Sequence, residues 1–358
     1  MPTSAPEPTP TPIIIIQTPT PVSDLDVAER RIIEVYQEVN PAVVHITAQL
    51  LRPDFFFGVH PQEGTGSGFV FDRDGHIITN YHVVENASEI MVSFHEGMDL
   101  PGQIIGTDPP NDLAVLQIDQ LPPDVEPIPL GDSGELQVGQ RAIAIGNPFG
   151  QFERTLTVGV ISAVNRTLIL DEEQVLRGVI QTDASINRGN SGGPLLDSSG
   201  RLIGINTAIF SPSGTSAGVG LAIPVNKLKR VAPSLIADGN YPHPWLGIER
   251  LGYPLFPELA QGLKLPVERG LLIAQIFRNS PAVRAGIQTA TDEVIFGRRR
   301  LLIGGDILTD IDGIPLTSWE DLEAYLDEKT EVGQTITLTL WRQTERLEIR
   351  VELDEEPM

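Results

Sequence analysis

The sequence predicts a mainly β protein followed by a smaller α+β domain, and three observations carry this prediction. The 34 glycines and 30 prolines favour many turns over long helices. Between residues 40 and 224, short β-type runs such as AVVHITAQL and RAIAIGN recur between clusters of Gly, Pro, Asn or Asp, a pattern typical of sandwiches and barrels. After NYPHPW (240–245), strand patterns alternate with a helical pattern at 318–328.

The chain begins with a segment that is not expected to fold. Residues 1–22 are rich in Pro and Thr, and this composition predicts a disordered stalk because it cannot bury enough apolar surface. The four isoleucines at 13–16 are too few to span a membrane or to form a signal sequence. Because the stalk begins abruptly, we expect that a signal or membrane anchor was removed from its N-terminal side.

Two folded domains are predicted after the stalk, at residues 23–240 and 241–358. The first opens with a short helix capped by Ser23 and Asp26, and it closes with a helix over 225–239. The helix of the second domain, at 318–328, starts with a capping box of Ser318 and Asp321.

The composition excludes several classes of function. Lys and Arg total 25 against 48 Asp and Glu, a net charge of −23 that repels nucleic acid phosphates, so we expect no nucleic acid partner. The absence of cysteine excludes disulfides and thiol nucleophiles. The six histidines show no short metal-ligand spacing, so neither a metal site nor another cofactor is expected.

Ser191, in a glycine-rich stretch, is the first candidate catalytic residue. In INRGNSGGPL (186–195), Ser191 follows Gly189 and Asn190 and precedes two further glycines. Glycine permits backbone angles that other residues avoid, so successive N–H groups can converge beside the hydroxyl and bind an oxyanion. A serine hydroxyl is a weak nucleophile unless a base accepts its proton, and that base must be oriented by an acid.

The sequence supplies both partners for this serine. His82 follows a strand-like run in TNYHVV, and Asp112 precedes another in NDLAVLQI. The order His82, Asp112, Ser191 is that of the chymotrypsin arrangement. Asp183 competes with Asp112 for the role of the acid, but we rank it lower because it precedes Ser191 by only eight residues. His76 is interpreted as structural.

Another glycine-rich stretch, GTGSGF (64–69), invites interpretation as a phosphate-binding loop. It lacks the lysine and the following helix that such a loop requires. We therefore interpret it as a loop that leads into a strand.

With these motifs in place, the chain resembles the HtrA/Deg family of trypsin-like serine proteases. The resemblance covers roughly residues 30–240, through stretches such as GSGFVFDRDGHIITNYHVV and DASINRGNSGGPLLDSSG. The tail, from WLGI (245–248) to GDILTDIDGIPLTSWEDLEAYL, is similar to the PDZ domain that follows in that family. The resemblance implies a chymotrypsin-like fold of two six-stranded β-barrels, with the triad between them, and one α+β PDZ domain.

The resemblance also implies a function. Members of the family are ATP-independent endopeptidases that cleave unfolded or damaged proteins, so unfolded protein or peptide substrates are expected. The PDZ domain is expected to bind C-terminal peptides and to regulate cleavage. A homotrimer, or a larger multiple of trimers, is the implied assembly, and the cell envelope or another extracytoplasmic compartment is the implied location.

Particular residues match family positions. The N–H groups of Gly189 and Ser191, with Asn190 between them, would form the oxyanion hole. The primary specificity pocket would be shaped by Ile186, Asn206 and Ile209, and because none of them is charged we expect cleavage after small or medium apolar residues.

Two further matches concern regulation. Arg166, in a loop between two strands, matches an arginine that senses a bound peptide or a neighbouring subunit. Leu246, Gly247 and Ile248 match the loop that binds the peptide carboxylate.

Two segments depart from the family pattern. The PDZ domain carries an insertion over 287–304 whose role the sequence does not explain. Phe55-Phe56-Phe57 form an apolar patch that we expect to be buried in a subunit contact.

Two other functions compete with that of a protease. A peptide-binding chaperone or scaffold with a vestigial protease is opposed by the intact Ser, His and Asp set. An esterase is opposed by the chain order and by the barrel pattern.

Overall fold

Short alternating strands close into two barrels in the part of the chain that the structure describes. The structure is a computed structural model that describes residues 26–357 except 55–57, 147–154, 170–174, 188, 210–217, 250–253 and 297–298. The expected stalk and the Phe55-Phe56-Phe57 patch therefore lie outside the described residues.

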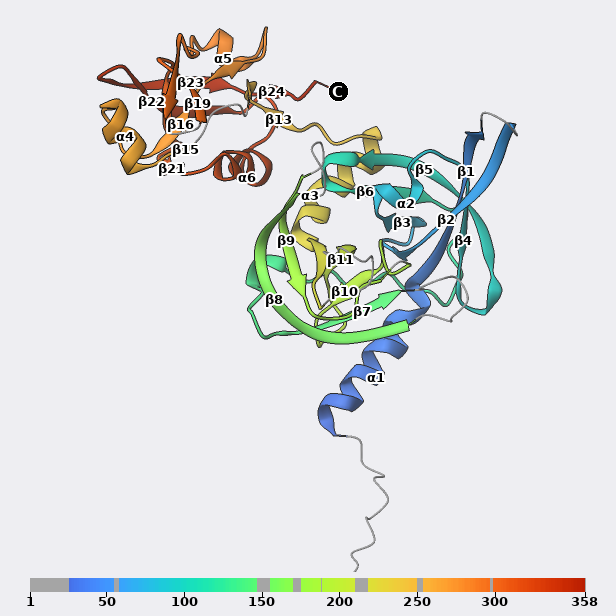
Figure 1. Cartoon of the computed structure of the whole chain (residues 1–358). Coiled ribbons are helices and arrows are strands. Elements are labelled where there is room, and N and C mark those ends of the chain that lie inside the picture. Colours follow the sequence, from blue (N-terminus) through green and yellow to red (C-terminus); the bar gives the residue numbers. More distant parts are fainter. Residues whose placement is uncertain are drawn as a thin grey trace, which may run out of the picture.

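The first barrel has the strand order β1-β2-β3-β6-β5-β4 (Figure 1). Its strands are β1 Val43–Asp54, β2 Gly58–Val70, β3 His76–Thr79, β4 Ala87–Ser93, β5 Asp99–Asp108 and β6 Leu113–Gln117. Large side chains such as Ile46, Phe69, Ile77 and Leu116 fill its interior and are fully buried, each contributing about 1.5–3 kcal/mol.

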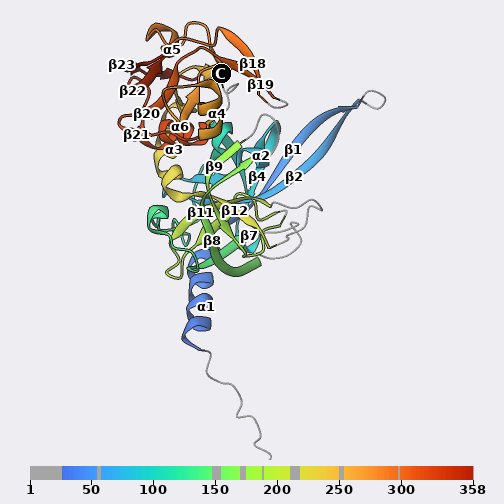
Figure 2. The same ribbon diagram turned by 60° about the vertical axis from the view of Figure 1, so that its left-hand side comes forward.

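The second barrel has the order β10-β11-β12-β9-β8-β7. Its strands are β7 Arg141–Gly146, β8 Thr155–Ile169, β9 Val175–Thr182, β10 Pro194–Leu196, β11 Leu202–Ile209 and β12 Gly220–Pro224. The two closed six-stranded barrels confirm the predicted fold class. The β1 and β2 strands extend as a long hairpin beyond the first barrel (Figure 2).

Two helices flank the barrels. The first, α1 Val27–Val39, projects from them on the side away from the C-terminal domain (Figures 1 and 2). Its capping box consists of Asp26 and Glu29, so the predicted cap at Ser23 is wrong by three residues. The second, α3 Val225–Asp238, packs on β5, β6, β11 and β12 and ends at Gly239 in the left-handed conformation, as predicted.

Two predictions about the barrel strands need correction. Residues 64–69, expected as a loop, lie inside β2, where they pair with β1. Arg166, expected in a loop, lies in β8 and pairs with Val179 of β9, because the β-prone residues after it continue the hairpin. The Arg166 side chain is exposed, and its regulatory role stays a prediction.

The C-terminal domain is built on one sheet with the order β15-β16-β20-β22-β23 and with β21 paired to β20. These strands are β15 Pro254–Leu255, β16 Gly270–Leu272, β20 Ile307–Ile311, β21 Ile314–Pro315, β22 Thr335–Arg342 and β23 Glu345–Glu352. Its helices are α4 Pro257–Leu263, α5 Pro281–Arg284 and α6 Trp319–Lys329. The capping box of Ser318 and Asp321 is present, as predicted.

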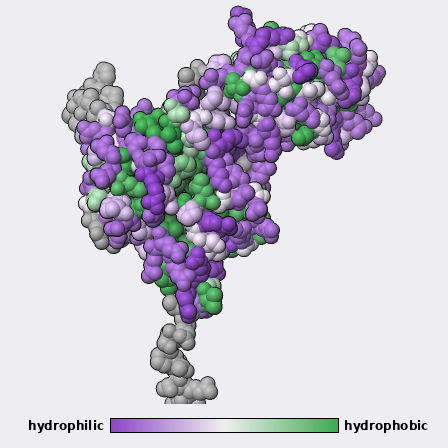
Figure 3. Space-filling view, turned by 180° about the vertical axis from the view of Figure 1, so that it is seen from behind, coloured by the Kyte–Doolittle hydropathy of each residue, from purple (hydrophilic) through white to green (hydrophobic). Residues whose placement is uncertain are grey.

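Three two-stranded ribbons complete this domain. They are β13 Pro244–Trp245 with β24 Asp354–Glu355, β14 Ile248–Glu249 with β17 Gln275–Ile276, and β18 Asp292–Phe296 with β19 Arg299–Ile303. The insertion at 287–304 therefore contains a β-hairpin, which the sequence did not predict. The face of the molecule in Figure 3 is mostly hydrophilic over this domain, whereas apolar residues gather over the barrels.

Short helices at strand ends account for the remaining elements. They are η1 Asn40–Ala42, α2 Tyr81–Val84, η2 His95–Gly97, η3 Pro109–Asn111 and η4 Ser133–Glu135. The α2 helix contains His82, and Asp112 directly follows η3.

Candidate active site

A histidine and an aspartate meet where two strands of the first barrel end. Asn80 precedes the single turn of α2, which places His82 next to Asp112 at the end of η3. His82 Nδ1 lies 2.9 Å from each carboxylate oxygen of Asp112, and the His82 backbone N–H donates to Oδ1 at 3.0 Å. Asp112 is 1% exposed, so its charge is directed at the imidazole rather than at water.

The environment of His82 suits a base. Burial would lower its pKa, but the hydrogen bond and the charge of Asp112, with a smaller contribution from Glu85, raise the pKa above the ordinary value. The His82 side chain is nevertheless 43% exposed. The ring can therefore exchange protons with a substrate or with water while Asp112 holds its other nitrogen.

A threonine that the sequence did not single out connects this pair to Ser191. Thr207 on β11 donates its hydroxyl to Asp112 Oδ2 at 2.5 Å, and its carbonyl oxygen accepts the Ser191 hydroxyl at 3.0 Å. The structure thus brings together the three predicted residues through one hydrogen-bonded chain. In substrate-free enzymes the catalytic hydrogen bonds are often not yet formed, so a Ser191 hydroxyl directed at Thr207 is compatible with transfer to His82.

The turn before Ser191 leaves two amide groups free. The Asn190 N–H donates to Asn187 O at 3.0 Å, and Gly189 has φ +98°, a left-handed angle that favours glycine. The N–H groups of Gly189 and Ser191 have no acceptor among the described residues. Two unpaired donors beside a serine hydroxyl are what an oxyanion hole needs.

The first barrel holds this turn from outside. The Ser67 N–H donates to Ser191 O at 2.8 Å, and the Ser67 hydroxyl donates to Gly189 O at 2.5 Å. A Cβ at Gly192 would lie 2.2 Å from Ser67 O and 2.3 Å from the Thr79 hydroxyl, and its φ is +83°. Only glycine fits at position 192, which explains why a glycine directly follows Ser191.

Other predicted residues lie in more ordinary surroundings. Asp183 Oδ1 accepts the Val160 N–H, so this carboxylate holds a strand rather than a histidine. His76 Nδ1 lies 2.6 Å from Asp72 Oδ2 at the start of β3, in agreement with its interpretation as structural.

The residues predicted to shape the specificity pocket are only partly described. Ile186 is buried with the core of the second barrel, and buried Asn206 donates to Pro194 O at 3.1 Å. The Ile209 side chain lies outside the described residues. The assignment of these three residues to a substrate pocket stays a prediction.

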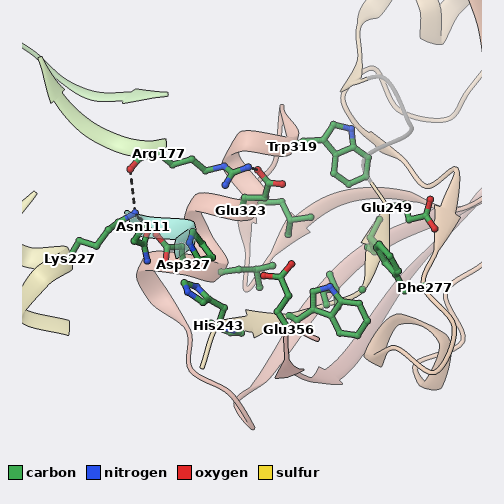
Figure 4. A pocket seen from close by; sticks show the side chains of 18 residues that line it. Asn111, Arg177, Lys227, His243, Glu249, Phe277, Trp319, Glu323, Asp327 and Glu356 are labelled. Atoms are coloured by element: carbon green, nitrogen blue, oxygen red, sulfur yellow. Dashed lines mark hydrogen bonds and ion pairs between the residues drawn. The ribbon is translucent and has the colours of Figure 1, made fainter. Parts of the chain in front are cut away.

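The predicted carboxylate-binding loop borders a cavity of about 620 Å³ (Figure 4). Leu246 O accepts the Ala282 N–H at 3.0 Å and Gly247 O accepts the Phe277 N–H at 2.9 Å, so both carbonyls are paired within the domain. Ile248 begins β14, across the cavity from α6. Apolar side chains of α6, among them Trp319 and Leu322, line the opposite wall.

The same cavity reaches the protease barrels. Arg177 of β9 forms an ion pair with Glu323 of α6, and Asp327 of α6 lies 2.9 Å from Lys227 Nζ and 3.0 Å from the Arg230 guanidinium. Burial would raise the pKa of Asp327, but the charges of Lys227 and Arg230 outweigh it and lower the pKa. These contacts between domains were not foreseen from the sequence.

Neither a metal cluster nor a membrane-spanning helix is found in the described residues. No group of three or more His, Asp or Glu side chains within 26–357, apart from the gaps, could hold a metal ion. Among the described helices, none is both long and apolar enough to cross a bilayer.

Two barrels with a Ser, His and Asp set, followed by a second domain, define the class of trypsin-like serine endopeptidases with an appended module. A trypsin-like peptidase domain profile matches residues 66–205, and a PDZ domain profile matches residues 257–353. The chain belongs to the HtrA/Deg family of these proteases, as the similarities below show.

Curated relatives come from a plant and a bacterium. Protease Do-like 1, chloroplastic, of Arabidopsis thaliana is 41% identical over 336 residues, which cover 93% of this chain and 74% of the relative. The periplasmic pH-dependent serine endoprotease DegQ of Escherichia coli (strain K12) is 37% identical over 335 residues, covering 89% of this chain and 69% of the relative.

Solved structures are similar along most of the chain. The HtrA-type protease AlgW with decapeptide has a TM-score of 0.74 and 33% sequence identity, and the match covers 91% of this chain and 99% of that one. The serine endoprotease from Yersinia pestis has a TM-score of 0.65 and 28% identity, with 91% and 98% covered.

Proposed function

We propose that Ser191, His82 and Asp112 form the catalytic triad of this serine endopeptidase. The Ser191 hydroxyl oxygen attacks a peptide carbonyl while His82 accepts its proton, and the protonated His82 then gives that proton to the leaving amine. Water hydrolyses the resulting acyl-enzyme with His82 again as the base. Asp112 holds His82 in the tautomer that leaves Nε2 free to accept the proton.

The observation that carries this proposal is the hydrogen-bonded chain from His82 through Asp112 and Thr207 to Ser191, beside two free amides. The N–H groups of Gly189 and Ser191 would bind the oxyanion, with Asn190 fixing the turn between them. Losing one such donor costs about 10²–10³ in kcat, so the shape of this turn controls the rate.

The experiment is cleavage of unfolded casein without nucleotide. We expect the wild-type protein to cleave it and Ser191→Ala to abolish cleavage, because the nucleophile is absent. Ser88→Ala is the matched control, since this exposed serine on β4 bonds only to Gln49 O and should keep full activity. Cleavage by Ser191→Ala at the wild-type rate would remove Ser191 from the mechanism, and a requirement for ATP would contradict ATP independence.

We further propose that the physiological substrates are unfolded or damaged proteins cut after small or medium apolar residues. The uncharged residues Ile186, Asn206 and Ile209 support this preference, because unfolding exposes apolar side chains. Sequencing the casein products tests it, and cuts mainly after Lys, Arg or Asp would contradict it.

The second domain is proposed to bind C-terminal peptides at Leu246, Gly247 and Ile248. A peptide would add as a strand beside β14, with α6 as the opposite wall of the groove. A fluorescent peptide with an apolar C-terminal residue should bind, whereas its amidated form should bind much more weakly because the carboxylate is lost. Equal affinities for the two forms would remove the loop assignment.

The assembly and the location are proposed from the relatives alone. We propose a homotrimer, or a multiple of it, which light scattering on the purified protein tests. Relatives named periplasmic and chloroplastic support an extracytoplasmic compartment.

A further inference from the structure

The turn that precedes Asp112 is held by side chains from other parts of the molecule. Asp108, the last residue of β5, accepts a hydrogen bond from Asn111 Nδ2 at 2.7 Å, and its Oδ1 lies 2.7 Å from His243 Nε2. Asn111 Oδ1 in turn accepts a hydrogen bond from Lys227 Nζ at 2.7 Å. The residue directly before the proposed catalytic acid is therefore fixed at both ends of its side-chain amide.

Lys227 is an unusual residue to find in this position. It is only 9% exposed, and lysine is almost never buried unless it is paired. Its ammonium group contacts three elements at once: Asn111 of η3, the Arg177 carbonyl oxygen of β9 at 3.3 Å, and Asp327 of α6. The ion pair with Asp327 compensates the charge of Lys227, which allows its ammonium group to be buried between the barrels and α6 (Figure 4).

The backbone of Asp112 depends on such support. Its φ of +54° is left-handed, a conformation that residues with a Cβ disfavour and keep only where neighbours hold them in place. Asn80 Nδ2 and the Tyr81 N–H both donate to Asp112 O, which fixes the C-terminal side of the residue. On the N-terminal side, the anchored side chain is that of Asn111.

We propose that Lys227 is a positioning residue for the triad. Its ammonium group anchors Asn111, and Asn111 fixes the backbone from which the Asp112 carboxylate orients His82. The proposal rests on the proposed role of Asp112. Because Asp327 of α6 shares the same ammonium group, the geometry of the triad is physically connected to the wall of the peptide groove.

The test compares Lys227→Met with Lys229→Met on a peptide substrate. Lys229 lies on the same helix but donates to Gly131 O, away from η3, so its replacement controls for loss of a lysine on α3. For Lys227→Met we expect kcat to fall about 10–100-fold at unchanged KM, the loss typical of a slightly misplaced catalytic group. The acid limb of kcat/KM should move to lower pH, because a loosely held Asp112 no longer raises the pKa of His82.

Control readouts separate positioning from folding. Titration with an irreversible serine reagent counts the competent sites. A smaller folded fraction would lower the apparent kcat but would not move the acid limb. A loss of kcat with an unmoved acid limb would therefore overturn the proposal. If Lys227→Met does not fold, Asn111→Ala keeps the ion pair of Lys227 with Asp327 and should give the same shift of the acid limb. An unshifted limb in Asn111→Ala would overturn the proposal equally. An inactive wild-type protein would instead refute the proposed function itself.

Discussion

Two buried aspartates, Asp108 and Asp112, flank η3, and each of them pairs with a different histidine. His82 pairs with Asp112 at 2.9 Å and His243 pairs with Asp108 at 2.7 Å. Both aspartates are almost completely buried, at 1% and 2% exposure. In both pairs burial would lower the histidine pKa, and the hydrogen bond and charge of the aspartate raise it instead.

Their surroundings give the two pairs different uses. The His82 side chain is 43% exposed and lies in the hydrogen-bonded chain that ends at the Ser191 hydroxyl. The His243 side chain is 17% exposed, packs edge-to-face on Tyr241 at 5.0 Å, and joins the linker between the domains to the first barrel. A His–Asp pair alone therefore does not indicate an active site, and the proposal for His82 and Asp112 rests on the Ser191 hydroxyl and the amides beside it.

Both histidines lose their proton as the pH rises through a raised pKa, but this change affects catalysis in one pair and a structural contact in the other. His82 must be neutral to accept a proton, so activity should rise as pH increases through its raised pKa. His243 binds Asp108 most strongly when the imidazole is charged, so that contact should weaken as the pH rises.

Replacing each aspartate by asparagine gives the largest expected difference between the pairs. Asp112→Asn should lower kcat about 10⁴-fold, because the amide favours the wrong tautomer of His82. Asp108→Asn should lower kcat far less, since Asp108 does not touch His82. Steady-state kinetics on one peptide substrate measure both, and equal losses in the two variants would show that the pairs are not functionally distinct.

A smaller effect is expected from the threonine that belongs to only one pair. Thr207→Val removes the hydroxyl that orients the Asp112 carboxylate, and a slightly misplaced catalytic group should lower kcat by about 10–100-fold. Thr309→Val is the matched control, because its hydroxyl bonds to Thr339 O within the sheet of the C-terminal domain. If both variants retain wild-type kcat, Thr207 does not support the acid.

The smallest expected effect is on stability and concerns the pair of His243 with Asp108. Because the folded-state pKa of His243 is raised, its contribution to stability is fully present below about pH 6.5 and is lost as the pH rises through the raised value. The unfolding midpoint of the wild-type protein should therefore exceed that of His243→Gln by roughly 2–4 °C at pH 6 and by less at pH 9. A difference that does not change with pH would show that His243 is not charged in the folded protein.

Sequence reasoning was most successful where the physical signal is local. Turn-separated β-type runs indicate a sandwich or a barrel, and the resemblance to the HtrA/Deg family then implies two barrels. A glycine-rich serine is usually only part of a turn, and the complete GNSGG motif with His82 and Asp112 is what indicates catalysis. The histidine and the aspartate then follow from the chemistry of that serine. Asp183 ranks below Asp112 on spacing, because it precedes Ser191 by only eight residues, and in the structure its carboxylate accepts the Val160 N–H.

The remaining site residues could not be found in this way. Thr207 and Ser67 act on partners 95 and 122 positions away, and a single hydroxyl residue carries no local pattern that predicts such a contact. The N-cap of α1 was placed three residues early because Ser23 with Asp26 and Asp26 with Glu29 fit the same capping pattern. The loop position predicted for Arg166 follows from the family resemblance, whereas the pairing of β8 with β9 continues through this residue.

The contact between Ser67 and the turn of Ser191 has a consequence for the newly made protein. Ser191, the proposed nucleophile, precedes the first strand of the second barrel in its chain order, but its turn is held by backbone and side-chain bonds from Ser67 of the first barrel. Chains are synthesised from the N-terminus, so the first barrel is complete before residue 191 has been added. The bonds from Ser67 to this turn form only when the two barrels dock, so a chain whose barrels are still apart lacks the support for the proposed oxyanion hole.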